Sequence, residues 1–248
     1  MKKIALITGA SSGIGRACAL KFGHAGYRLI LTGRNADKMA DLAAEFGDDA
    51  LILEYDVRDL EACKAAVASI PADWQDIYVL INNAGLALGL DKEYQGDTTD
   101  WDTMIDTNIK GLLYMTRLIV PGMVERGKGQ VINIGSVAGD AAYANGNVYC
   151  ATKAAVKAIS DGLRIDVADT PIRVTTLKPG LVETNFSKVR FHGDEQRAET
   201  VYKGIQPLTG DDIADVALYA AQAPAHVQIA EVLILATHQA NGSTIVRK

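Results

Sequence analysis

Short, nearly continuous apolar runs recur along this chain and are separated by segments of helical character. Seven of these runs are predicted to be strands, at residues 3–8, 27–32, 50–56, 78–82, 130–136, 172–179 and 227–235. Strands that are apolar on both sides are typical of a parallel sheet buried between two layers of helices. The alternation therefore predicts an α/β fold, with a seven-stranded, doubly wound parallel sheet and helices on both faces.

The predicted helices cover residues 13–25, 35–46, 59–69, 100–126, 148–168 and 210–222. The alternation has no Pro/Ser-rich break, so residues 1–248 are predicted to form a single domain. One segment of about 29 residues, 181–209, departs from the pattern. A segment of that length inside a domain is usually a functional loop, so we expect a substrate lid there. Its residues 187–194, SKVRFHGD, have no helical or strand period and are predicted to be loop.

Charge and composition argue against several classes of function. Twenty-five Lys and Arg against thirty Asp and Glu give a net charge of −5, with no long block of like charge. We therefore expect no nucleic-acid partner and no membrane surface partner. No apolar stretch approaches the ~20 residues that span a bilayer, and the first one is too short for a secretory signal. Three scattered cysteines and four dispersed histidines favour a cytoplasmic protein with reduced thiols and no metal site.

A glycine-rich turn, TGASSGIG at residues 8–15, follows the first predicted strand and opens the first predicted helix. Gly9, Gly13 and Gly15 let the backbone turn tightly and approach a pyrophosphate, which the start of the helix attracts. The turn therefore indicates a Rossmann fold that binds a dinucleotide. Its GxxxGxG spacing matches the usual GxGxxG only in kind, and the alternative is a turn that binds nothing.

The second predicted strand ends in LTGRN, which has Arg34 where a site for NAD would be expected to have Asp or Glu. An acid would repel a 2′-phosphate, whereas a guanidinium binds it with two hydrogen bonds. The sequence therefore favours NADP as cofactor. The alternative is that Arg34 is a solvated residue at the start of a helix.

Tyr149 and Lys153 are four residues apart in the helix predicted over 148–168, so they share one face. An ammonium group beside a phenol stabilises the phenolate, so the pKa of Tyr149 is expected to fall from ~10 towards the range of a working proton donor. Such pairs are more often surface packing. This one gains weight from Ser136, at the end of the fifth predicted strand, where ligands bind in this architecture.

Six motifs in this order resemble the short-chain dehydrogenase/reductase family: TGASSGIG, NNAG at 82–85, Asn108, Ser136, YCATK at 149–153 and PGLVET at 179–184. The resemblance implies that Tyr149 is the general acid/base and that Lys153 holds the nicotinamide ribose and lowers the pKa of Tyr149. It also implies that Ser136 hydrogen-bonds the substrate oxygen and that Asn108 anchors a water in a proton relay.

The family resemblance further implies a binding site for NADP. Asp56 and Val57 would line the adenine. The residues implied in cofactor binding are Gly9, Ser11, Ser12, Gly13, Ile14, Gly15, Arg34, Asp56, Val57, Asn82, Ala84, Gly85, Tyr149, Lys153, Pro179, Gly180, Val182 and Thr184. The last four match the stretch that holds the nicotinamide amide. The family also implies a homotetramer.

Longer stretches, such as NNAGLALGLDKE, GLVETNFS and VRFHGD, resemble one branch of this family. That branch holds the NADP-dependent 3-hydroxy acid dehydrogenases, which include serine and allo-threonine dehydrogenases and malonic semialdehyde reductases. The implied reaction is oxidation of the 3-hydroxyl of serine, allo-threonine, 3-hydroxyisobutyrate or 3-hydroxypropionate, or reduction of the corresponding semialdehydes and ketones.

The carboxylate of such a substrate needs a cation away from the reacting carbon. The motifs leave none free, because Lys153 is engaged with the ribose and Tyr149, so Arg190 in segment 181–209 is the candidate. The alternative is that Arg190 forms a salt bridge with Asp194, Glu195 or a neighbouring element. Asn145 and Asn147 are weaker candidates for contact with a polar substrate.

Two other functions stay open. The chain could be a broad-specificity carbonyl or 3-oxoacyl reductase of the same family. It could also be a regulator that binds NADP without turnover, although intact Ser136, Tyr149, Lys153 and Asn108 argue against that. Lys188 and His192 have no role that the sequence explains.

Overall fold

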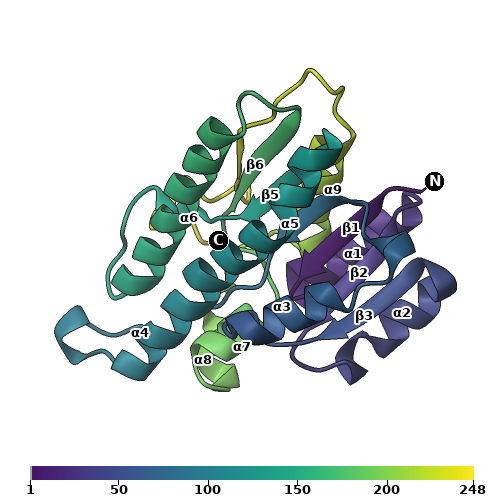
Figure 1. The fold of residues 1–248 in the computed structure, drawn as a ribbon. Helices are drawn as coiled ribbons and strands as arrows, with labels where there is room; N and C mark the ends of the chain where they lie inside the picture. Colours follow the sequence, from purple (N-terminus) through teal and green to yellow (C-terminus); the bar gives the residue numbers. More distant parts are fainter. Residues whose placement is uncertain (1) are drawn as a thin grey trace.

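The apolar runs form strands that are buried on both faces. In the computed structural model of this protein, which describes residues 2–248, they make one seven-stranded parallel sheet in the order β3-β2-β1-β4-β5-β6-β7 (Figure 1). The strands are β1 (Ile4–Thr8), β2 (Arg28–Gly33), β3 (Ala50–Glu54), β4 (Ile77–Asn82), β5 (Gly129–Ile134), β6 (Ile172–Pro179) and β7 (Glu231–Ile234). The predicted fold class is confirmed.

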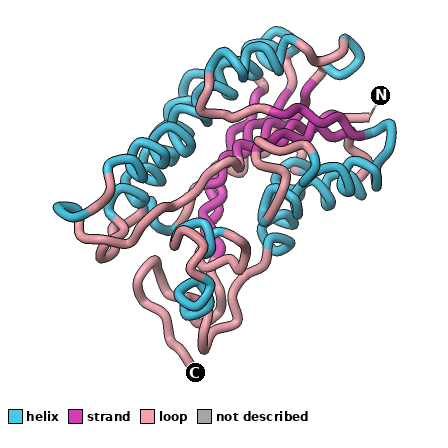
Figure 2. The backbone as a smooth tube through the Cα atoms, turned by 90° about the horizontal axis from the view of Figure 1, so that it is seen from below, coloured by secondary structure: helices cyan, strands magenta, loops and turns pink. Residues whose placement is uncertain are grey.

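Two layers of helices cover the sheet, and Figure 2 shows the strands between them. One face carries α1 (Gly13–His24), α2 (Ala40–Phe46) and α9 (Gly210–Gln222), and the other carries α3 (Leu60–Ala68), α5 (Leu112–Arg126) and α6 (Asn147–Asp166). Neighbouring strand residues serve opposite layers, as Leu6 and Ile7 do, and both are fully buried. Each such side chain stabilises the fold by roughly 1.5–3 kcal/mol.

The helix predicted over 100–126 contains a wider turn in its middle. It consists of α4 (Thr98–Ile105), a π-helical turn (Asp106–Gly111) and α5, which follow one another without a break. Gly111 in this turn packs against Val57, in the segment that follows β3, where an added Cβ would come within 2.8 Å of Val57 Cγ2. The π-turn marks a local departure from ideal helix geometry, of the kind frequently found at functional sites.

Segment 181–209 is not the continuous loop that the sequence predicted. It contains two short helices, α7 (Phe186–Arg190) and α8 (Glu195–Thr200). The prediction that residues 187–194 form a loop is therefore wrong in part, because the first four of them belong to α7 and only the others form a turn. Each helix is too short to show a 3.6-residue period. Asp194 caps α8, because its Oδ1 accepts from the backbone N–H of Arg197 at 3.0 Å.

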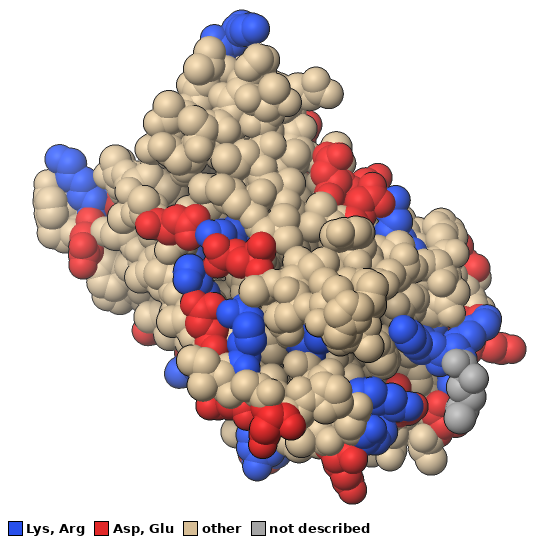
Figure 3. Space-filling view, turned by 90° about the horizontal axis from the view of Figure 1, so that it is seen from above, with Lys and Arg blue, Asp and Glu red and all other residues tan. Residues whose placement is uncertain are grey.

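Charged side chains of both signs share the surface. On the face shown in Figure 3, Lys and Arg groups lie next to Asp and Glu groups. Among residues 2–248, no helix is both long and apolar enough to cross a membrane. Within the same residues, no three His, Cys, Asp or Glu side chains come together as a possible metal site.

Candidate active site

A cavity of about 500 Å³ opens at the carboxyl ends of the central strands. From β1 the sheet is extended in one direction by β2 and β3 and in the other direction by β4 to β7. Ligands of open parallel sheets bind at this switch point, between β1 and β4. The sequence-predicted residues that line the cavity are Gly9, Ser11, Ser12, Gly13, Ile14, Arg34, Asp56, Val57, Ala84, Gly85, Ser136, Tyr149, Lys153, Pro179, Gly180, Val182, Thr184 and Arg190. Three predicted residues, Gly15, Asn82 and Asn108, do not line it.

The glycine-rich turn depends on backbone conformations that side chains disfavour. Gly9 and Gly13 have φ values of +68° and +53°. Gly15 instead packs behind the turn, because an added Cβ there would come within 2.3 Å of the Gly9 carbonyl oxygen. The turn is further held by Asn83, whose Nδ2 donates to the carbonyl oxygens of Thr8 and Gly9 at 2.9 and 3.2 Å.

Asn82 lies in the core and not beside the cavity. It is 4% exposed, and its Nδ2 donates to Thr116 Oγ1 at 3.1 Å and to Asn133 Oδ1 at 2.9 Å. Its neighbour Asn83 lines the cavity in its place. Asn82 is the last residue of β4 and joins it to β5, whereas Asn83 follows the strand in the turn that faces the cavity.

Two arginines lie near the ends of β2 and β3. Arg34 is exposed, and within the described residues 2–248 its guanidinium forms no ion pair. Arg58, which the sequence did not single out, binds Asp56 through Nε and Nη2 at 3.0 and 2.7 Å. Burial opposes ionisation of Asp56, but the hydrogen bonds from Arg58 and the charge of Arg34 hold its pKa below the usual range. The guanidinium of Arg34 therefore lies at the edge of the cavity without an ion-pair partner among residues 2–248.

Ser136, Tyr149 and Lys153 come together inside the cavity, as the motifs predicted. The Lys153 Nζ lies 5.9 Å from the centroid of the Tyr149 ring and donates to the carbonyl oxygen of Ile134 at 2.8 Å. The Ser136 Oγ accepts from the N–H of Ala138 at 3.1 Å. These contacts hold an ammonium and a hydroxyl beside one phenol.

The predicted fall in the pKa of Tyr149 is not what the structure gives. Burial raises the pKa of the Tyr149 phenol, although a hydrogen bond with Ser136 and the charge of Arg190 act in the opposite direction. Burial also lowers the pKa of the Lys153 ammonium to about 8. Spacing in the sequence shows that the two groups are neighbours, but the loss of water around both of them decides the direction of the shifts.

Asn108 is buried in the π-turn and joins two elements of the site. Its Oδ1 accepts from the N–H of Leu86 at 2.9 Å, and its Nδ2 donates to the Leu86 carbonyl at 2.8 Å and to Thr152 Oγ1 at 3.0 Å. The side chain is thus used to fasten the segment after β4 to α6. Its predicted role as a water anchor stays a prediction.

Arg190 reaches the cavity without an acidic partner among residues 2–248. Its Nε donates to the Gly89 carbonyl at 3.2 Å and its Nη1 to the Tyr143 hydroxyl at 2.9 Å. Its Cζ lies 5.7 Å from the centroid of the Tyr149 ring. The alternative pairing with Asp194 or Glu195 is therefore not formed.

The other basic side chains of SKVRFHGD have acidic partners. Lys188 pairs with Glu195 at 2.7 Å, and His192 Nε2 lies 3.0 Å from Asp100 Oδ2. The second contact fastens the turn after α7 to α4. Both residues that the sequence left without a role thus contribute to how segment 181–209 folds.

Tyr143 is a cavity residue that the sequence analysis missed. It packs with Phe186 against the cluster that contains Tyr149, and the Phe186 and Tyr149 ring centroids are 5.6 Å apart. No motif marks Tyr143, and only its position six residues before Tyr149 could have drawn attention to it. Asn145 and Asn147 do not line this cavity, and Asn147 Nδ2 donates to Glu93 Oε2 at 3.3 Å.

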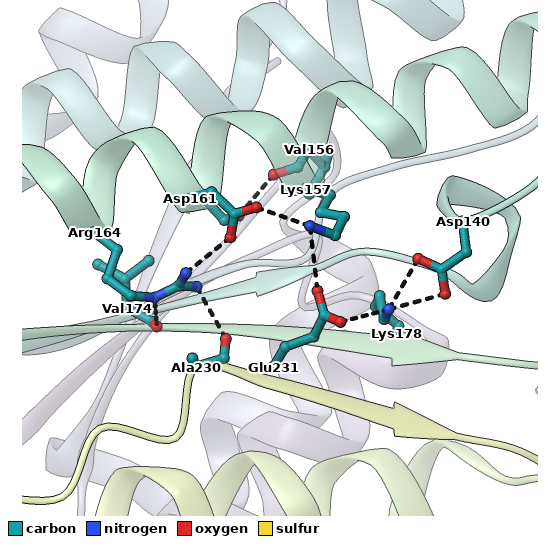
Figure 4. Close-up of polar contacts among 10 residues, drawn as sticks. Asp140, Val156, Lys157, Asp161, Arg164, Val174, Lys178, Ala230 and Glu231 are labelled. Atoms are coloured by element: carbon teal, nitrogen blue, oxygen red, sulfur yellow. Dashed lines mark hydrogen bonds and ion pairs between the residues drawn. The ribbon is translucent and has the colours of Figure 1, made fainter.

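Lys178 forms an ion-pair cluster beside the site (Figure 4). Its side chain is 8% exposed, and its Nζ lies 2.9 Å from Asp140 Oδ2 and 2.6 Å from Glu231 Oε1. Asp140 ends the short turn that begins at Ser136, and Pro179 follows Lys178 directly. The cluster therefore ties the Ser136 turn to β6 and to β7.

Comparison with known proteins shows which family the chain matches. The family model described as short chain dehydrogenase matches residues 3–195. The NADP-dependent 3-hydroxy acid dehydrogenase YdfG of Salmonella typhi is 49% identical over 227 residues, covering 91% of this chain and 92% of the relative. The NADP-dependent 3-hydroxy acid dehydrogenase of Schizosaccharomyces pombe is 44% identical over 251 residues, covering 99% and 97%.

A solved structure is similarly close. The closed form of a serine dehydrogenase in complex with NADP+ superposes with a TM-score of 0.95 at 45% identity, covering 99% of both chains. The serine dehydrogenase of Escherichia coli superposes with a TM-score of 0.82 at 42% identity, covering 93% of this chain and 96% of that one. The similarity to the first of these structures covers 99% of this chain and therefore includes the cavity and segment 181–209.

Proposed function

The chain belongs to the short-chain dehydrogenase family, and on this premise we propose that it is an NADP-dependent oxidoreductase of small 3-hydroxy acids. It oxidises the 3-hydroxyl of compounds such as serine, allo-threonine, 3-hydroxyisobutyrate or 3-hydroxypropionate, or reduces the corresponding semialdehydes and ketones. The observation that carries the substrate class is the guanidinium of Arg190, which lies beside Tyr149 without an acidic partner among residues 2–248. The names of the relatives support the same class.

The cavity residues fit NADP. The positive φ of Gly9 and Gly13 opens the turn to a pyrophosphate at the start of α1, and Arg34 stands at the end of β2 with its guanidinium free for a 2′-phosphate. β2 ends in Thr32 and Gly33, so this strand itself supplies no carboxylate to accept a 2′-hydroxyl. When bound, the nicotinamide accepts or supplies the hydride.

The protein's own groups then handle the proton. Ser136 and Tyr149 donate hydrogen bonds to the oxygen on the reacting carbon, where negative charge develops in the direction of reduction. Burial, which raises the pKa of Tyr149, keeps its proton in place at neutral pH, and the protonated phenol is the form that can donate. Lys153 holds a positive charge near this phenol and donates a hydrogen bond to a hydroxyl of the nicotinamide ribose.

Arg190 supplies the cation for the substrate carboxylate. Its Nε and one Nη1 hydrogen are used by Gly89 and Tyr143, which leaves Nη2 free to donate. Segment 181–209 acts as the lid that brings this guanidinium to the cavity. Losing a buried charge pair of this kind costs about 2–5 kcal/mol.

The proposal is tested by steady-state kinetics with a panel of hydroxy acids and NADP or NAD. We expect turnover with NADP, and Arg190→Met should raise KM for serine or 3-hydroxypropionate roughly 30- to 4000-fold while sparing an uncharged ketone. Lys188→Met is the matched control, because Lys188 lies in the same helix but pairs with Glu195. Equal loss on acid and ketone would remove Arg190 from the proposal, and tight NADP binding without any turnover would favour a regulator.

We further propose that the enzyme works in the cytoplasm as a homotetramer, with family membership as the support. Static light scattering on the purified protein tests the oligomeric state. A mass equal to one 26.4 kDa chain would contradict the tetramer.

A further inference from the structure

The hydroxyl of Tyr143 lies at the same point of the cavity as the guanidinium of Arg190. The Arg190 Nη1 donates to the Tyr143 oxygen at 2.9 Å, and both residues line the cavity with Tyr149. The ring of Tyr143 packs against Gly146, where an added Cβ would come within 2.0 Å of Tyr143 Cε2. The position of the phenol is therefore set from both sides, by a glycine below its ring and by an arginine at its oxygen.

This arrangement leaves the phenolic proton available. Arg190 uses a lone pair of the Tyr143 oxygen, so the hydroxyl is an acceptor there and keeps one O–H to donate. Among residues 2–248, the other side chain that hydrogen-bonds this phenol is the Cys150 thiol, whose sulfur is a weak acceptor that a carboxylate oxygen can replace. Burial raises the pKa of Tyr143, against the influence of Arg190, so the proton stays on the oxygen at neutral pH.

A carboxylate offers two oxygens, and this corner of the cavity offers two adjacent donors. We propose that Tyr143 is a substrate-binding and specificity-determining residue, whose O–H donates to the carboxylate that Arg190 binds. The inference rests on the proposed function, since it names the second half of the carboxylate subsite. A donor of this kind discriminates against substrates that lack the carboxylate, because their binding leaves a partly buried hydroxyl and guanidinium without an acceptor.

Steady-state kinetics of Tyr143→Phe test the proposal. Phenylalanine keeps the ring on Gly146 and removes only the hydroxyl. We expect KM for 3-hydroxy acids to rise about 10- to 100-fold, the range for a hydrogen bond to a charged group, with a much smaller change in kcat. The rise should be largely absent for an uncharged ketone. Tyr219→Phe is the matched control, because Tyr219 is 69% exposed on α9, away from the cavity.

The double variant Tyr143→Phe with Arg190→Met separates substrate binding from a structural role. If both side chains hold one carboxylate, the loss in the double variant is smaller than the product of the two single losses. An equal fall in kcat for acids and for uncharged ketones would overturn the inference, because it would show that Tyr143 acts on the geometry of Tyr149. Unchanged KM in Tyr143→Phe would also overturn it.

The same measurements keep this inference apart from the proposed function. If the unmodified enzyme turns over no 3-hydroxy acid, the proposed function fails. If it turns over these acids and Tyr143→Phe does so with the same KM, only the role of Tyr143 fails.

Discussion

At the scale of single residues, loss of water around the reacting groups decides how they titrate. Tyr149 and Lys153 are both buried, and burial raises the pKa of the phenol while it lowers that of the ammonium to about 8. Their spacing of four residues was enough to predict that they share a helix face. It was not enough to predict the direction of the Tyr149 shift, because that depends on Phe186 and Tyr143, which close over the phenol from other parts of the chain.

The buried ammonium of Lys153 is expected to cost stability. A lysine whose folded-state pKa lies below its unfolded value destabilises the fold at any pH below the folded pKa, and the cost disappears as pH rises to the unfolded pKa. For Lys153 that window runs from about 8 to 10.5. At 1.36 kcal/mol per pKa unit, the cost at neutral pH is roughly 3 kcal/mol.

Lys153→Met should therefore abolish turnover and yet leave the protein at least as stable at pH 7. We expect the free energy of unfolding of the unmodified enzyme to rise from pH 8 to pH 10 relative to that of the variant. Urea unfolding at pH 7, 8, 9 and 10 measures this difference. Lys157→Met is the control, since Lys157 is one turn further along α6 and pairs with Asp161 near the surface. Parallel pH dependence in the enzyme and Lys153→Met would contradict the assignment.

At the scale of elements, long periodic segments were predictable and short ones were not. The helices α1 and α9 match their predicted ranges to within one residue. The π-turn and the helices α7 and α8 were missed, because each is too short to display a period. The π-turn also depends on bonds from Asn108 to Leu86, which lies 22 residues away in the sequence.

Lys178 shows how neighbouring elements hold a reacting group in place. It binds both oxygens of Asp140 at 2.9 Å, and Asp140 ends the turn that Ser136 begins. Removing the ammonium would leave Asp140 and Glu231 as two carboxylates facing one empty position. The Ser136 turn would then be free to shift, and shifts of about 1 Å at a reacting centre can cost 100-fold in rate.

We expect Lys178→Met to lower kcat about 10- to 100-fold with a smaller effect on NADP affinity, and Lys178→Arg to restore most of the loss. Glu231→Gln is the control, because it removes the β7 partner and retains the bond between Lys178 and Asp140. Steady-state kinetics and NADP titration of the three variants make the comparison. If Glu231→Gln lowers kcat as much as Lys178→Met does, the ion-pair cluster stabilises the sheet as a whole and does not specifically position the Ser136 turn.

At the scale of the whole molecule, the sheet order brings distant motifs to one edge. Parallel strands end on the same side, so the ends of β1, β2, β4, β5 and β6 meet around the cavity. That convergence could be predicted from the alternation of strands and helices. The way segment 181–209 folds back towards the cavity could not be predicted. It depends on contacts such as those of Arg190 with Gly89 and of His192 with Asp100, which join parts of the chain about 100 residues apart.

Because the cavity is made by so many separate elements, a ligand that fills it should stabilise the whole fold. NADP at 100 times its Kd should stabilise by about 2.7 kcal/mol, which for a chain of this length raises Tm by roughly 5–10 °C. NAD at the same concentration should raise Tm much less, because it gives Arg34 no phosphate to bind. Differential scanning fluorimetry with each nucleotide measures both shifts.

Arg34→Ala provides the decisive comparison. Its guanidinium is exposed, so the variant should fold with the same Tm when no nucleotide is added. The shift produced by NADP should then fall to that produced by NAD, since the 2′-phosphate has lost its cation. Equal shifts by NAD and NADP in the unmodified enzyme would contradict the role of Arg34. A preference for NADP that survives in Arg34→Ala would instead transfer that role to Arg58, the other guanidinium at this end of the sheet.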